Sequence, residues 1–380
     1  MKTILLLLFI PFCLTSQTTE SIINEVNLDS LVQNINILTG VIPILNGISI
    51  PERKSVEGRQ LSATFLEKKL KEYGLVTNID NYRLGGNNVI GFQEGTKYPD
   101  SSFIISAHYD AVAEYCADDD ASGTSAVLEA ARILSQYQFD YSIIYALWDE
   151  EELGLIGSRN YADKAAENNE NIVGNLNMDM IGYDGNDDGL FEVHLNNTGL
   201  TRRLHDVLKF TYEENEFDSD LFLFTAEKGV TNSDHSSFWR KGYGAILITE
   251  AYTNNDFNPD YHKASDRITG FNLDYYHNVS KLTIATLSEL AVLSKSTSIL
   301  EKYNNNISIY PNPVVDYINL PGIDSPIISL EIIDITGRTL DITKELSVNK
   351  INVEKVPNGL YSLIARTSER QFISKFIKIQ

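Results

Sequence analysis

Cysteine is almost absent from this sequence, which excludes a disulfide framework as the source of stability. Only Cys13 and Cys116 occur among 380 residues, and Cys13 falls within an N-terminal segment that we expect to be removed. With one cysteine left, the mature chain cannot form an internal disulfide. Its stability must come from a hydrophobic core and from any metal that it binds. A Cys116 thiolate is a conceivable metal ligand, but we favour a half-buried free thiol.

Positive charge is also scarce, and this bears on the partners of the protein. The chain has 31 basic and 52 acidic residues, which give a formal net charge of -21. Such a balance argues against nucleic acid and against an anionic membrane surface as partners. The hydrophobic content of 43% and the charged content of 22% are those of an ordinary globular protein. The length suits two or three domains.

Apolar runs long enough to span a membrane are missing. The run at residues 4–10 follows Met1 and Lys2 and leads to polar residues 15–17. A basic start, a short apolar segment and a polar end predict a secretory signal peptide over residues 1–17. The alternative is a buried first strand or helix. Because the run is too short for a stable membrane span, we expect none.

Residues 18–293 alternate between strand and helix patterns. Strands alternating with helices predict a three-layer α/β/α sandwich with a mixed, largely parallel sheet. In such sheets ligands bind at the carboxyl ends of the strands. The predicted strands cover residues 88–92, 103–107, 142–147, 172–178 and 244–249, and the predicted helices cover 30–38, 57–73, 122–137, 155–166, 201–213 and 273–293.

The polar stretch at residues 294–306 predicts a linker, and the pattern of apolar residues changes after it. Residues 307–380 contain short β-type runs separated by turn residues such as Thr336-Gly337 and Pro357-Asn358-Gly359. This pattern predicts a separate, small all-β sandwich. The segment has no histidine and no cysteine, so no catalytic constellation is visible in it.

Acidic and imidazole side chains follow the predicted strands of the first domain. Because the carboxyl ends of parallel strands meet at one edge of a sheet, these side chains could converge there. The candidates are His108 and Asp110 after 103–107, Asp119 in the next loop, Glu151 and Glu152 after 142–147, Asp179 after 172–178, and His262 in a polar loop.

These residue types suit two zinc ions held close together. Such a pair needs one carboxylate that bridges both ions and further imidazole and carboxylate ligands for each. We assign Asp119 as the bridge, with His108 and Asp179 completing one site and Glu152 and His262 the other. Each residue alone has a plainer interpretation, since a histidine at a strand end is often structural and an acidic run often begins a helix. The joint pattern is much harder to obtain by chance.

Two further residues are predicted to take part in catalysis. Glu151 is a carboxylate left off the metals, and it could take a proton from a metal-bound water as general base. Asp110 lies two residues beyond His108 and could hold the other ring nitrogen of that imidazole, which would fix its tautomer.

At this point the sequence resembles the secreted zinc aminopeptidases of the bacterial leucyl aminopeptidase type. Their superfamily also includes glutaminyl cyclases and transferrin-receptor-like carboxypeptidases. The resemblance spans roughly residues 56–293, and the five ligands and the base match position by position. It implies a dizinc hydrolase that acts on peptides with a free N-terminus. The matching segments are AHYDA (107–111), ADDDASG (117–123), EEELGLIGS (150–158), NMDMIGY (177–183), NSDHSSF (232–238) and YHKASD (261–266).

Other interpretations fit some of these residues. His235 lies in one of the matching segments but is not a ligand in the family, so we expect a structural or substrate-side role. A glutaminyl cyclase, an acyltransferase on the same fold, would bind one zinc ion. The second alternative, a non-catalytic binding module, is disfavoured by the intact Glu151.

The C-terminal segment resembles a type IX secretion sorting domain. The resemblance rests on residues 307–313, the turns at 336–337 and 357–359, and the closing residues 375–378. It implies passage through the periplasm, the type IX machinery as a partner, and a secreted or cell-surface location. A carbohydrate- or protein-binding β-sandwich is the alternative.

One loop has the spacing of a calcium site. Residues 184–189 match D-x-N-x-D-G, with Asp184 and Asp188 among the candidate ligands. The twelfth position, where a glutamate is expected, holds Leu195, although Glu192 is nearby. We favour a surface turn over a bound calcium ion.

Overall fold

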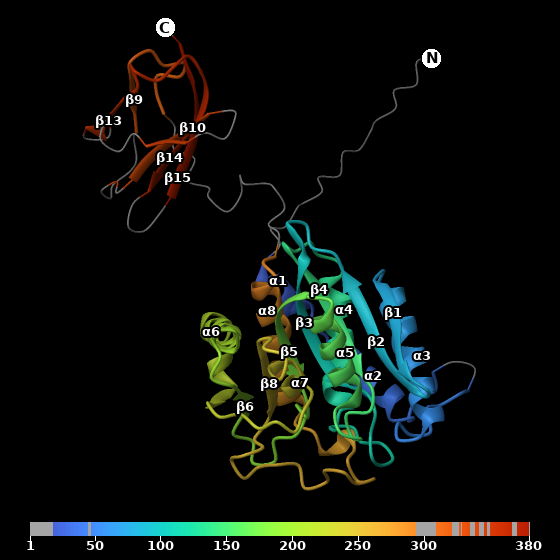
Figure 1. Cartoon of the computed structure of the whole chain (residues 1–380). Coiled ribbons are helices and arrows are strands. Elements are labelled where there is room, and N and C mark those ends of the chain that lie inside the picture. Colours follow the sequence, from blue (N-terminus) through green and yellow to red (C-terminus); the bar gives the residue numbers. More distant parts are fainter. Residues whose placement is uncertain are drawn as a thin grey trace, which may run out of the picture. The chain divides into compact units, whose positions relative to one another are not determined.

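The computed structural model describes two compact units (Figure 1), one within Gln17–Lys295 and the other within Ser296–Gln380. The predicted signal peptide (1–17) and linker (294–306) lie outside the described residues. No helix in the described part of the chain is long and apolar enough to cross a membrane. The residues described are 18–44, 47–293, 309–320, 327, 329–334, 339–341, 346–347, 350–366 and 371–379.

The larger unit is built on an eight-stranded mixed sheet. Its four central strands are mutually parallel, whereas β1, β2 and β6 add antiparallel pairings. The strand order is β1 (Val76–Arg83), β2 (Gly86–Gln93), β4 (Tyr141–Trp148), β3 (Tyr98–His108), β5 (Asn171–Met178), β8 (Ala245–Glu250), β6 (Leu190–His194) and β7 (Phe222–Ala226).

Helices cover both faces of this sheet, so the predicted three-layer α/β/α sandwich is confirmed (Figure 1). One face carries α2 (Leu28–Leu38), α3 (Val56–Glu72), α4 (Ala121–Leu134) and α8 (Leu273–Leu290). The other carries α5 (Ile156–Glu167) and α7 (His235–Trp239). Finally, α1 (Thr19–Glu25) and α6 (Gly199–Glu214) pack against α8.

The second half of the central strand β3, residues 103–108, is buried on both faces, and this explains its apolar run at residues 103–105. Ile105 packs in the core beneath α4 and α8, while its neighbour Ile104 packs with α5 and α7. Full burial of such a side chain contributes roughly 1.5–3 kcal/mol. The last residue of β3, His108, is therefore held at the middle of the sheet edge.

The smaller unit consists of two antiparallel sheets that share one core, in agreement with the predicted all-β sandwich. Leu330, Leu363 and Phe376 enter this core from one sheet, and Ile318 and Ile351 enter it from the other. The four-stranded sheet has the order β11 (Thr339–Asp341), β10 (Ser329–Asp334), β14 (Gly359–Arg366) and β15 (Gln371–Lys378), and the three-stranded sheet has the order β12 (Leu346–Ser347), β13 (Lys350–Asn352) and β9 (Tyr317–Asn319).

Candidate metal centre

The carboxyl ends of the parallel strands supply the candidate site residues. His108 ends β3, Asp179 directly follows β5, and Glu151 lies in the turn after β4. The loop after β8 carries His262 to the same edge. A cavity of about 380 Å³ opens there, and all of these side chains line it together with Asp119.

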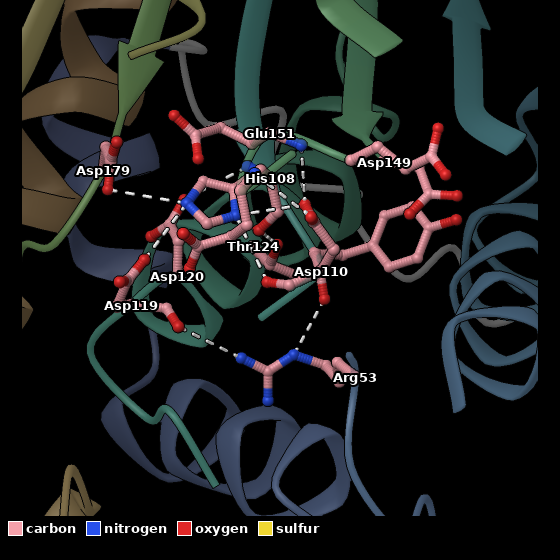
Figure 2. Close-up of polar contacts among 12 residues, drawn as sticks. Arg53, His108, Asp110, Asp119, Asp120, Thr124, Asp149, Glu151 and Asp179 are labelled. Carbon is pink, nitrogen blue, oxygen red and sulfur yellow. Dashed lines mark hydrogen bonds and ion pairs between the residues drawn. The ribbon is translucent and has the colours of Figure 1, made fainter. Parts of the chain in front are cut away.

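Asp119 lies between the two imidazoles. Its Oδ1 atom is 3.2 Å from Nε2 of His108, and its Oδ2 atom is 3.2 Å from Nε2 of His262. The His108 Nε2 atom is also 3.7 Å from Oδ1 of Asp179, and the His262 Nε2 atom is 3.0 Å from Oε2 of Glu152. Figure 2 shows Asp119 and Asp179 converging on the His108 ring. The structure thus brings together all five residues expected to be ligands.

A neighbouring carboxylate, Asp120, also lies within reach of His108 and Asp179. Its oxygens already accept backbone N–H groups, at 3.2 Å from His108, 2.9 Å from Gly123 and 3.3 Å from Met180. The contact with Gly123 makes Asp120 the N-cap of α4. We therefore interpret Asp120 as the residue that fixes the loop and keep Asp119 as the candidate bridge.

The electrostatics of the cluster call for a cation. Burial raises the pKa of Glu152 to about 9 and raises that of Glu151 well above its usual range. Although burial opposes it, the imidazoles of His108 and His262 hold the pKa of Asp119 below its usual range. Buried carboxylates this close together repel one another unless a positive charge lies among them.

Two oxygens of the cluster are available to such a cation. Oδ2 of Asp119 and Oε1 of Glu152 are buried and accept no hydrogen bond within the described residues, although the former faces the His262 ring. A buried polar atom without a partner is costly, and a metal would satisfy it. Carboxylate and imidazole donors without a thiolate fit zinc. The residues present therefore fit the metal that the sequence predicts.

Asp110 connects the imidazole to the turn that carries the predicted base. The Nδ1 atom of His108 lies 3.4 Å from Oδ1 of Asp110 and 3.3 Å from its backbone oxygen. The same carboxylate accepts the backbone N–H groups of Glu151, at 3.0 Å, and Glu152, at 3.2 Å. Figure 2 shows Asp110 in contact with both His108 and Glu151. The sequence predicts the contact of Asp110 with His108 but not its contacts with this turn. Through both, Asp110 fixes the candidate ligand His108 and the candidate base Glu151 relative to each other.

A buried ion-pair network supports that turn from behind. Arg59 contacts Asp149 at 2.8 Å and Glu150 at 3.0 Å. Tyr82 donates to Glu150 at 2.9 Å, and Arg83 lies 2.7 Å from the same carboxylate. Glu150 has a φ of 62°, a left-handed conformation that needs such support. The acidic run therefore divides between structural residues and residues that face the cavity.

Arg53 organises the loop between β3 and α4, and no motif marked it in the sequence. Its side chain is 1% exposed, and it donates to backbone oxygens rather than to a carboxylate (Figure 2). A buried guanidinium also places a positive charge behind the acidic cluster. The acceptors are the backbone oxygens of Leu38 at 3.2 Å, Tyr109 at 2.8 Å, Tyr115 at 2.7 Å, Cys116 at 2.7 Å and Asp119 at 3.4 Å.

Cys116 is a free thiol, as expected, but it is fully buried rather than half-buried. Burial raises the pKa of its thiol to about 11. Among the described residues, no group able to hold a metal includes it. A buried, neutral thiol is a structural feature, so the thiolate-ligand interpretation loses its support.

Asp266 connects the loop between β3 and α4 to the segment that carries His262. Its carboxylate accepts the backbone N–H groups of Asp118 and Asp119, each at 3.1 Å, and its backbone oxygen accepts that of Ala117 at 3.2 Å. The sequence segment around His262 therefore contributes a loop anchor as well as a candidate ligand.

His235 has a structural position. Its ring is fully buried, its Nε2 atom is 2.9 Å from the backbone oxygen of Val230, and it packs edge-on against Trp239. Burial lowers its pKa to about 3. It does not line the cavity of the candidate metal centre, which agrees with the expectation that it is not a ligand.

A second buried pair, Glu192 and His194, anchors two loops of the cavity wall. The backbone N–H of Val230 donates to Nδ1 of His194 at 3.2 Å, so Nε2 carries the proton that is shared with Glu192 at 2.8 Å. Glu192 also accepts the backbone N–H of Thr253 at 2.6 Å and the side-chain amide of Asn254 at 2.8 Å. The pair thus holds both the Val230 loop and the loop leading to His262.

The loop with calcium-like spacing is stabilised by its own hydrogen bonds. Asp184 accepts the backbone N–H groups of Asp188 at 3.2 Å and Gly189 at 3.3 Å, and Asn272 donates to both Asp184 and Asp187. Among the described residues, no group able to hold a metal includes these aspartates. This geometry favours the surface turn.

Known proteins with similar sequences and folds agree with this architecture. The profile of peptidase family M28 matches residues 88–287, and that of the secretion system C-terminal sorting domain matches residues 308–380. Aminopeptidase YwaD of Bacillus subtilis is 29% identical over 57% of this chain and 47% of its own length. The chain spans about half the length of the first curated relatives that it matches.

Solved structures show the same fold. LapA of Legionella pneumophila is 25% identical with a TM-score of 0.61, covering 72% of this chain and 75% of that one. A glutaminyl cyclase of Bacteroides thetaiotaomicron, 16% identical with a TM-score of 0.54 over 69% of this chain and 98% of its own, shares the fold. Because the M28 profile matches more than half of the 380 residues, the chain belongs to peptidase family M28.

Proposed function

We propose that this protein is an extracellular metallo-aminopeptidase that removes the first residue of a peptide with the help of two zinc ions. The observation that carries the proposal is the position of Asp119 between two candidate ligand groups, with Glu151 in the same cavity. Membership of peptidase family M28 and the similarity to an aminopeptidase support it.

Zinc bound here would polarise the scissile carbonyl and lower the pKa of water. His108 and Asp179 would hold one ion, Glu152 and His262 the other, and Asp119 would contact both. Glu151 accepts the proton from the attacking water and returns it to the leaving amine. Its turn is held by Asp110, so the base keeps a fixed position relative to His108.

The lining of the cavity supports a preference for peptides with a free N-terminus. Its carboxylates offer oxygen acceptors to the α-amine of a substrate, and an acylated amine would lose that interaction. Apolar side chains form part of the remaining wall, beside polar ones such as Asn232, Ser233 and Thr249. The apolar residues are Leu155, Met180, Val230, Leu247 and Phe257. We therefore propose that the first residue of a good substrate is apolar.

A panel of leucyl peptides with free and acetylated amines tests this function. The purified protein should cleave only the first bond of the free peptides, and chelation should abolish the activity. Efficient hydrolysis of acetylated peptides would show that the reaction has been assigned wrongly. Release of ammonia from N-terminal glutamine by a protein with a single zinc ion would favour the glutaminyl cyclase alternative. Substrate binding without turnover would favour a binding module.

We also propose that residues 307–380 direct export. Their match to a secretion sorting domain supports the type IX machinery as the partner. The enzyme would cross the periplasm and act outside the cell or on its surface.

A further inference from the structure

A second cavity of about 490 Å³ adjoins the candidate metal centre. Leu155 and Arg159 line both cavities, so the two share a wall. The backbone N–H of Leu155 donates to the backbone oxygen of Glu151 at 2.7 Å. The second cavity therefore adjoins the turn that carries Glu151, the residue proposed to protonate the leaving amine.

The second cavity carries two arginines without acidic partners. Arg159 and Arg240 both line it and are exposed, and neither forms an ion pair with any described residue. The nearby Lys241, by contrast, lies 2.6 Å from the carboxylate of Asp163. Two unpaired cations at one hollow are unusual in a chain whose net charge is -21, and they would attract an anionic group.

Rigid elements hold the two arginines. Arg159 lies in the first turn of α5, and Arg240 directly follows α7. These helices are joined by the hydroxyls of Ser158 and Ser237, which are 2.9 Å apart. The position of α7 is fixed further, because Trp239 donates its indole N–H to the backbone oxygen of Ala245 at 2.8 Å.

We propose that this hollow, the arginine cavity, binds a carboxylate of the substrate downstream of the scissile bond. Guanidinium groups match the planar carboxylate and bind it with paired hydrogen bonds. The carboxylate is either the C-terminus of a short peptide or an acidic side chain after the first residue. This inference rests on the proposed aminopeptidase function and defines its substrates as short or acidic peptides.

Matched peptides test the proposal. Leucyl-glycine and leucyl-glycyl-glycine are compared with their C-terminal amides, and leucyl-aspartamide is compared with leucyl-asparaginamide. The carboxylate member of a preferred pair should have a kcat/KM about tenfold higher, as for a hydrogen bond to a charged group. A preference among the first pairs identifies the C-terminus as the bound carboxylate, and a preference for leucyl-aspartamide identifies the acidic side chain. Higher ionic strength should reduce the preference.

Variants assign the preference to the cavity. Substituting both arginines, Arg159→Gln with Arg240→Gln, should bring the ratio of kcat/KM values to about one. Arg203→Gln removes a comparable exposed cation on α6 and should leave the ratio unchanged. Equal rates for the members of every pair in the native protein would overturn the proposal, as would a preference that survives the double substitution.

Direct binding separates this proposal from the proposed function. The same peptides are titrated into protein carrying Glu151→Gln, in which turnover is suppressed. Tighter binding of the carboxylate peptides, lost in the double arginine variant, supports the arginine cavity even if no peptide is hydrolysed. Equal affinities for carboxylate and amide peptides overturn it, even for an active aminopeptidase.

Discussion

Glu151 is the residue on which the proposed chemistry depends, because it is the carboxylate in the cavity that is left free of the candidate ligand groups. The substitution Glu151→Gln keeps its shape and removes its proton acceptor. Turnover should fall by about 10²–10⁴-fold, the usual contribution of a positioned acid–base group. Both metals should remain bound, because the proposed ligands are unchanged.

Steady-state kinetics and elemental analysis of one preparation measure the turnover and the metal content together. The matched control is Glu167→Gln, an exposed glutamate on α5, which should leave both values unchanged. Near-normal turnover by the Glu151→Gln variant would mean that another group is the base.

The convergence of the cavity-facing residues could be predicted from the sequence, because a parallel sheet brings its strand ends together wherever the strands lie in the chain. His108, Asp179 and Glu151 follow three different strands and meet in one cavity. The role of Arg53 could not be predicted, because its partners are backbone atoms up to 66 residues away. Asp266 was missed in the same way, because only the folded loop brings backbone N–H groups to it.

At the scale of elements, the loop between β3 and α4 depends on Arg53. Arg53→Met should leave several backbone oxygens buried without donors, at a cost of about 3 kcal/mol or more. For a unit of this size, such a loss lowers the melting temperature by roughly 6–12 °C. Calorimetry of this variant beside Arg203→Met, an exposed control on α6, measures the difference. Equal melting temperatures for the two variants would show that the loop between β3 and α4 is stable without Arg53.

The Glu192–His194 pair on β6 should control substrate binding through two loops. In His194→Asn the amide oxygen replaces Nδ1 and keeps the acceptor for Val230, whereas His194→Gln places its amide near Nε2 and keeps the contact with Glu192. We expect KM to rise severalfold in each variant with a smaller change in kcat, because the loops line the cavity but do not carry the base.

Steady-state kinetics on peptides with different first residues test this expectation. Combining either variant with Glu192→Gln should add little to KM, since both residues belong to one network. Unchanged KM values in a stably folded His194→Ala variant would show that the pair has no part in recognition.

Strands β1 and β6 were not predicted from the sequence, and the structure explains why. β1 lies at the sheet edge with about every second side chain exposed, and only Val76 and Ile79 are aliphatic in it. β6 contains the buried Glu192 and His194, so its apolar pattern is interrupted by polar residues that anchor the cavity wall. Buried polar residues of this kind obscure a strand in the sequence because their role depends on distant loops.

At the scale of the whole molecule, each unit has its own hydrophobic core. Removing residues 307–380 should therefore leave the M28 unit folded and active, with kcat and melting temperature close to those of the full chain. In the cell the truncated protein should remain in the periplasm, which fractionation and activity measurements would show. Loss of activity in the purified truncated protein would make the tail part of the catalytic unit.

The central claim is a pair of metal ions that share Asp119. Anomalous diffraction at the zinc absorption edge, from crystals of zinc-loaded protein, tests it most directly. The account predicts two peaks, one beside His108 and Asp179 and one beside Glu152 and His262, each about 2.0–2.2 Å from an oxygen of Asp119. A single peak in a fully active protein, or two peaks without a shared Asp119, would contradict it.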